Sequence, residues 1–131
     1  MKFNFNHDDK RRCELLGIKY PADWSYGGCI HFKNLNNENF NLLAMENFID
    51  PYDSQNDSPT ADEFREFINK YPEVTAHGYA VSPDRYDYRV TIEGIEYYGI
   101  VSKEMLIDFI NLCRYADEFI IEDDMLYCWF D

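Results

Sequence analysis

Basic residues are scarce in this chain, which holds 12 lysines and arginines against 25 aspartates and glutamates, a formal net charge of −13. Proteins that bind nucleic acid draw affinity from basic side chains that neutralise phosphates, so direct nucleic-acid binding is not expected. The imbalance lies in residues 51–131, where 18 acids meet 6 bases. A charged partner of this region would therefore be basic, although ordinary solubilising acidity gives the same composition.

Long apolar runs are also missing. No stretch approaches the roughly 20 apolar residues of a membrane helix, and Met1–Asn6 does not resemble a signal peptide. We therefore expect a cytoplasmic protein without membrane contact. The cysteines Cys13, Cys29, Cys113 and Cys128 include no C-x-x-C pair, and in that compartment they are expected to be reduced and partly buried.

Catalytic and nucleotide-binding motifs are absent as well: there is no P-loop, no G-x-G-x-x-G and no G-x-S-x-G. Cys29 and His31 lie two apart, which on a strand places both on one face. A zinc site usually adds a second close pair of ligands, and none is present. The main prediction is a protein without cofactor, metal or catalysis. A small enzyme or metal protein that uses Cys29, His31 or His77 is an alternative.

Aromatic residues are abundant, at 18% of 131 residues, and predict a single domain, 1–131, with a packed core. The clearest pattern is the alternation of apolar and polar residues over Tyr86–Val101. It predicts a β-hairpin that turns at Glu93-Gly94, because Gly supplies the positive φ of such turns. Ser102 is expected to cap the helix that follows.

The remaining elements follow from caps, turns and periodicity. We expect a helix capped by Asn6 and ended by Gly17, strands at Gly28–Phe32 and Val74–Val81, a helix opened by the capping box Thr60–Glu63, and a terminal hairpin of 119–121 and 125–130 around Asp123-Asp124. Asn34–Asn39 favours a turn or loop. Phe40–Phe48 fits a strand or a helix, and we favour the strand. The fold class is α+β, with a mainly antiparallel sheet and two to three helices packed on one face.

The candidate binding residues are acids and aromatics of the two hairpins. Either the terminal hairpin is buried on both sides, or Tyr127 and Trp129, which share one of its faces, form an exposed patch rimmed by acids. Tyr and Trp are common anchors of interfaces, and carboxylates around them steer a basic partner. The predicted partner-binding residues are Asp87, Glu96, Tyr98, Glu122, Asp123, Asp124, Tyr127 and Trp129.

In composition alone the chain resembles inhibitor proteins of mobile elements, which are small, acidic and rich in aromatics. They include toxin-neutralising immunity proteins and phage-encoded antagonists of nuclease defences such as anti-CRISPR proteins. The resemblance covers no alignable segment and transfers no residues. It implies a non-enzymatic protein that occludes a basic partner, such as a nuclease or another nucleic-acid-handling protein. A homo-oligomeric scaffold joined through the terminal hairpin is a third hypothesis.

Overall fold

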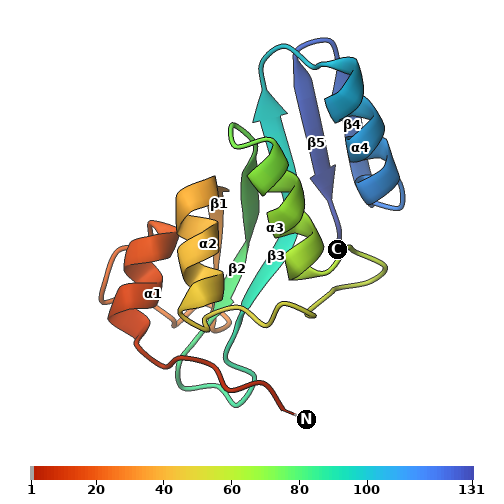
Figure 1. Ribbon diagram of the computed structural model, residues 1–131. Helices are drawn as coiled ribbons and strands as arrows, with labels where there is room; N and C mark the ends of the chain where they lie inside the picture. The colour runs from red at the N-terminus through yellow and green to blue at the C-terminus, as the bar shows by residue number, and fades with distance from the viewer. Residues whose placement is uncertain (1) are drawn as a thin grey trace.

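The computed structural model describes residues 2–131, which form four helices and one five-stranded sheet. The strand order is β1-β2-β3-β5-β4, and every neighbouring pair is antiparallel. This confirms the α+β class and the antiparallel sheet (Figure 1). In chain order the elements are α1 (Asp9–Leu16), β1 (Cys29–Leu35), α2 (Asn37–Met45), α3 (Ala61–Lys70), β2 (Thr75–Val81), β3 (Val90–Tyr98), α4 (Lys103–Cys113), β4 (Glu118–Glu122) and β5 (Met125–Trp129).

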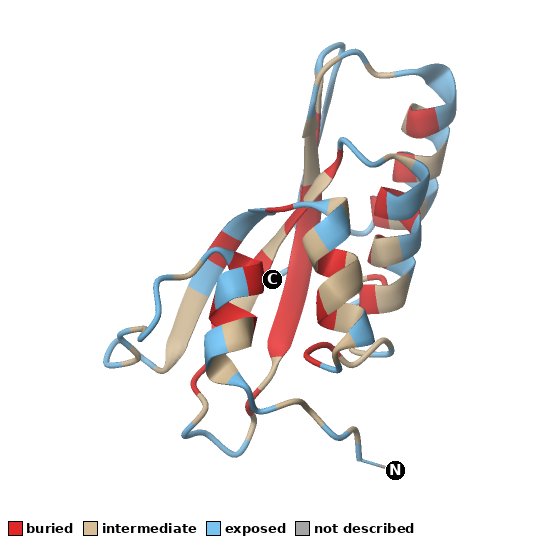
Figure 2. Cartoon of the chain, turned by 60° about the vertical axis from the view of Figure 1, so that its left-hand side comes forward, coloured by how far each residue is buried: buried red, intermediate tan, exposed pale blue. Residues whose placement is uncertain are grey.

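The core lies between the sheet and the helices. All four helices contribute buried apolar side chains to one cluster, and β1, β2, β3 and β5 contribute theirs from the facing side of the sheet. Figure 1 shows the helices in front of the sheet, and Figure 2 shows buried residues running through the centre while the far sides of the helices are exposed. The helix-facing side of the sheet is therefore the core side, and on the other side the loop before α3 contacts Tyr79 and Thr91 through Gln55 and Asp53.

Helix ends follow local chemistry closely. Gly17 ends α1 in the left-handed conformation (φ 73°), Thr60–Glu63 forms the reciprocal capping box of α3, and the Ser102 hydroxyl accepts the third amide of α4. These three predictions are confirmed. The prediction of Asn6 as the first cap is wrong, because the side chain of Asp8 accepts the third amide of α1 at 3.1 Å.

Phe40–Phe48 is the segment where the favoured strand is wrong. It contains most of α2, whose buried residues Phe40 and Leu43 lie three apart, as one face of a helix requires. The Asn-rich tract Asn34–Asn39 is only partly a loop, because the Asn36 side chain caps α2 and accepts the Asn39 amide at 2.8 Å. The side chain that favours a turn thus also starts a helix.

The hairpin predicted at Glu93-Gly94 is also wrong, because β3 runs straight through both residues between β2 and β5. Gly94 serves close strand approach instead of a turn: a Cβ there would fall well inside contact distance of the Cys128 carbonyl oxygen. Glu93 is the extra residue of a β-bulge, since the pairing with β2 jumps from Gly94 to Ile92. The bulge interrupts the side-chain alternation, which is what made the run resemble two strands.

The terminal hairpin forms as predicted, with β4 and β5 joined at Asp123-Asp124. Leu126 and Cys128 are buried on the core side, and Tyr127 and Trp129 are half-buried on the other. β4 is the edge of the sheet, and all five of its residues are exposed. The structure thus lies between the two alternatives for this hairpin: one side is covered by helices, and the other presents half-buried aromatic rings.

Candidate partner-binding face

The side of the sheet that faces away from the helices gathers acidic and aromatic residues. Residues opposite each other on neighbouring strands share a face. The register pairs Glu96 with Tyr127 and Tyr127 with Ile120, and it pairs Trp129 with Glu118. We call this surface the outer face. It consists of Glu93, Glu96, Tyr98, Glu118, Ile120, Glu122, Met125, Tyr127 and Trp129, with His31 and Lys33 on β1 and His77 on β2 beside it.

Glu93 anchors the centre of the outer face. The bulge in β3 places this residue at only 5% exposure, and a buried carboxylate needs partners. The Trp129 indole nitrogen donates to one carboxylate oxygen at 3.2 Å, and His31 Nδ1 lies 3.4 Å from the other. The bulge thereby fixes the orientation of the largest aromatic ring on the face.

Tyr127 is held in a negatively charged setting. Its ring stacks on the His77 ring, with centroids 5.3 Å apart and planes 8° apart. His77 Nε2 donates to the Cys128 carbonyl oxygen at 3.0 Å, and burial lowers the pKa of His77 below its ordinary value. Partial burial raises the pKa of Tyr127, and the negative charges of Glu118 and Glu96 raise it further.

Three carboxylates of the outer face form no ion pair within the described chain, although Lys33 lines the same hollow as Glu96. Within residues 2–131, no salt bridge within 4.0 Å is made by Glu96, Glu118 or Glu122. Their charges therefore act on the solvent and on any approaching molecule. A cation over these rings would meet both the carboxylates and the electron-rich faces of the aromatics.

The structure brings most of the predicted binding residues together. Glu96, Tyr127 and Trp129 share the outer face, and the Tyr98 hydroxyl donates to Glu96 at 3.3 Å. The negative charge of Glu96 is the main cause that raises the pKa of Tyr98. Glu122, Asp123 and Asp124 are exposed at the tip of the terminal hairpin, where the Asp124 carbonyl oxygen accepts from the Gly99 amide just after β3.

Asp87 stands apart from the other predicted residues. It lies in the loop before β3, at the opposite end of that strand from the terminal hairpin's tip. Arg85 and Arg89 pair with its carboxylate at 2.7 and 3.2 Å, and the hydrogen bond from Arg85 is the main cause that lowers the pKa of Asp87. Its charge is thus neutralised within the chain.

The sequence places Glu93 and Glu118 among the acids of the two hairpins, but neither is among the predicted partner-binding residues. The prediction puts Glu93 in a turn, and nothing local reveals that a bulge turns its side chain toward Trp129. A signal for Glu118 was present: it lies two residues before Ile120, and residues two apart on a strand share a face. The predicted register of the terminal hairpin, which places Tyr127 opposite Ile120, extends directly to Glu118 opposite Trp129.

The alternative site at Cys29, His31 and His77 is only partly assembled. The two histidines flank the outer face, but Cys29 Sγ lies 3.6 Å from Arg85 Nη1, near a cation and not a base. Across residues 2–131 no three His, Cys, Asp or Glu side chains are grouped so as to hold a metal ion. The geometry gives neither a nucleophile–base pair nor a ligand set.

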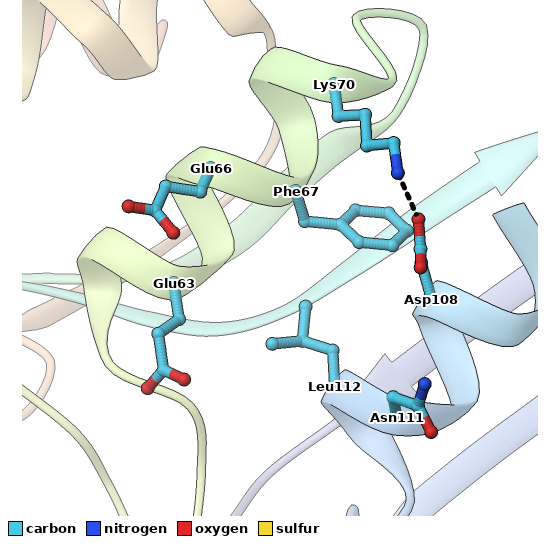
Figure 3. A pocket seen from close by; sticks show the side chains of 7 residues that line it. All are labelled: Glu63, Glu66, Phe67, Lys70, Asp108, Asn111 and Leu112. Carbon is cyan, nitrogen blue, oxygen red and sulfur yellow. Dashed lines mark hydrogen bonds and ion pairs between the residues drawn. The ribbon is translucent and has the colours of Figure 1, made fainter.

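A groove between α3 and α4 is the other surface hollow that we considered (Figure 3). Lys70 reaches from α3 to Asp108 on α4 at 2.8 Å and also pairs with Glu104 at 2.9 Å. The Tyr71 hydroxyl donates to the same Asp108 carboxylate at 2.5 Å. The ion pairs of Lys70 and the hydrogen bond of Tyr71 thus join α3 to α4 across one part of the groove, while Glu63 and Glu66 in its lining form no ion pair within residues 2–131.

Comparisons of the chain with protein-family models, with curated proteins and with solved structures find no match. Over residues 2–131, none of the helices has the length and apolar character needed to cross a membrane. The interpretation of the outer face therefore rests on its own residues.

Proposed function

We propose that this chain is a non-enzymatic binding protein whose outer face engages a basic protein and inhibits it by occlusion. One observation carries the proposal: the carboxylates of Glu96 and Glu118, which form no ion pair within residues 2–131, lie opposite the half-buried rings of Tyr127 and Trp129, and Glu122 lies further along β4. Aromatic anchors supply binding energy once water is excluded. Carboxylates around them accelerate association with a cationic surface and set its specificity.

The partner we propose is a nuclease or another nucleic-acid-handling protein. Such proteins carry rows of Lys and Arg that bind phosphates, and carboxylates fixed on a rigid sheet present negative charge in a similar spaced arrangement. The four cysteines are free, which suits the cytoplasm, where we propose that the protein acts. In biological role this corresponds to immunity proteins and anti-CRISPR proteins.

The enzyme and metal-protein alternative has less support, because Cys29 lies near Arg85 while His31 and His77 flank the outer face. Burial raises the pKa of the Cys113 thiol, which makes this core residue a poor nucleophile. The scaffold alternative depends on the exposed edge of the sheet, where like charges would face each other in a symmetric pair.

The test is affinity capture from the lysate of the source organism at low and at high salt. The immobilised chain is compared with Glu96→Lys/Glu118→Lys, which reverses two charges on the outer face. The expected result is a basic nucleic-acid-binding protein that is retained by the wild type, released by salt and lost in the variant. The nuclease or nucleic-acid-binding activity of that protein should fall when the wild-type chain is added.

The matched control is Glu66→Lys/Glu73→Lys, which changes the net charge equally but alters exposed residues away from the outer face. The control is expected to retain the partner. Equal loss in both variants would mean that net charge alone drives capture. Retention by the outer-face variant at all salt concentrations would contradict the proposal.

A further inference from the structure

β4 is an edge strand whose protection against pairing with another strand consists of its short length and the glutamates at its two ends. It pairs with β5 over Glu118–Glu122 without a register shift, and within the described chain no strand lies on its other side. All five residues are exposed, and Phe119, Ile120 and Ile121 form a continuous apolar centre. An edge strand directs every second amide and carbonyl outward, where another chain can pair with them.

The opposite edge of the sheet, β1, shows what protection looks like. Its register with β2 shifts between Phe32 and Leu35, and Asn34 there adopts a positive φ of 60°. The exposed Lys33 lies at the same point. A bulge and a lysine on an edge strand both oppose pairing with another chain. β4 has neither, and its only charges are the glutamates at its two ends.

These glutamates oppose pairing between two copies of the chain. In an antiparallel pair of β4 strands centred on Ile120, Glu118 lies opposite Glu122 of the second copy, and the same contact recurs by symmetry. A shift by two residues, which keeps the two faces of the sheet in place, sets Glu118 opposite Asp124 in one direction and opposite Ile120 in the other. The centred register and the first of these shifts set like charges directly against each other, which destabilises a strand pair.

We propose that β4 pairs with an extended segment of the basic partner, which adds a sixth strand to the sheet. The segment has Lys or Arg opposite Glu118 and Glu122, and apolar residues between them. The proposal rests on the proposed function and deepens it. The added strand would lie beside the outer face, because Glu118 and Ile120 share that face with Trp129 and Tyr127. Main-chain bonds would supply affinity, and the two cations would supply specificity.

The probe is a capped peptide with the core Lys-Val-Val-Val-Lys, titrated against the full chain at low salt. Its control has the core Lys-Val-Pro-Pro-Lys, with the same charge and similar apolar character. Because amides alternate in direction along a strand, two consecutive prolines must remove one that faces β4. We expect binding by the first peptide and at least about tenfold weaker binding by the second.

Hydrogen exchange locates the contact. Outward amides of β4 should exchange quickly in the free chain and about tenfold more slowly with the first peptide bound. Glu118→Lys/Glu122→Lys should lose the peptide, whereas Glu66→Lys/Glu73→Lys should retain it. Such selective loss, together with protection of β4, would support strand addition.

The contrary outcomes separate this inference from the proposed function. Equal binding of the two peptides, or no protection of β4, would overturn strand addition while leaving an electrostatic face for a basic protein. Failure of the first peptide, with salt-sensitive capture of a basic protein intact, would do the same. A dimer in sedimentation whose outward β4 amides exchange slowly without any peptide would assign the edge to a second copy of the chain and overturn the inference.

Discussion

Replacement of Gly94 by Ala should disrupt the packing that positions the outer face. A Cβ at this position would be driven into the Cys128 carbonyl oxygen and would lie 2.8 Å from the His77 ring. The ring could turn aside, but the carbonyl belongs to the backbone of β5. Relief therefore requires β3 and β5 to separate, which lengthens two bonds: Phe130 N to Glu93 O at 2.8 Å, and His77 Nε2 to Cys128 O at 3.0 Å.

The size of the effect follows from these contacts. Overpacking of a close-packed site costs about 1–3 kcal/mol, and each weakened hydrogen bond contributes about 1 kcal/mol. We therefore expect a loss of roughly 3–5 kcal/mol in the free energy of unfolding. For a domain of this length, that lowers the melting temperature by roughly 10–18 °C.

Urea unfolding and thermal melts of Gly94→Ala would measure this loss. The control is Gly17→Ala. The left-handed backbone at position 17 (φ 73°) favours glycine, but nothing lies within 4 Å of a Cβ added there. It should lose only about 1–2 kcal/mol from left-handed strain. If Gly94→Ala lost no more stability than Gly17→Ala, the close approach of β3 and β5 would not be a real constraint.

Two further predictions concern buried polar residues. Burial lowers the pKa of His77, so below its ordinary pKa of about 6.5 the unfolded chain binds more protons than the folded one. As the pH falls from about 7.5 to about 5.5, the unfolding free energy of the wild type should therefore decrease more than that of His77→Gln, as measured by urea titrations. Parallel curves of unfolding free energy against pH for the two proteins would refute this prediction. Arg12 is fully buried against Asp9, so Arg12→Met should lose about 3–5 kcal/mol. Arg11→Met, at a partly exposed ion pair, should lower the free energy of unfolding by up to about 1 kcal/mol. Equal losses in the two variants would contradict the expectation that the buried arginine contributes more stability than the exposed one.

Local chemistry predicted the elements whose determinants are contiguous in sequence. Thr60–Glu63, Ser102 and Gly17 act through backbone groups within a few residues, so their signals survive without knowledge of the fold. The two-residue turn at Asp123-Asp124 is of the same kind, and its register placed Tyr127 opposite Ile120 correctly.

The prediction for the central strand β3 was wrong for a physical reason that the neighbouring residues in sequence do not reveal. Glycine serves both a hairpin turn and a close strand approach. Only the neighbouring strand decides between them, and at Gly94 that neighbour is β5, which lies about 34 residues downstream. The bulge at Glu93 likewise depends on the pairing with β2. The same bulge brings the Glu93 carboxylate to the Trp129 indole. The sequence does not reveal this pairing, so Glu93 is not among the predicted partner-binding residues.

Carboxylates without an ion pair are expected over much of this chain, because 25 acids meet only 12 lysines and arginines; the outer face differs in carrying aromatic rings among its acids. On the helical side and at the start of β3, cations of the chain are engaged: Arg11 with Glu46, Lys70 with Asp108, and Arg85 with Asp87.

Glu96, Glu118 and Glu122 on the outer face form no ion pair within residues 2–131, as is also true of acids elsewhere such as Glu66 and Glu73. The arrangement becomes favourable when a cationic surface covers the rings, because the same carboxylates then gain partners in a drier environment. The acids of the outer face and the exposed β4 edge lie side by side. One basic partner could therefore pair with the carboxylates and with the outward backbone groups of β4.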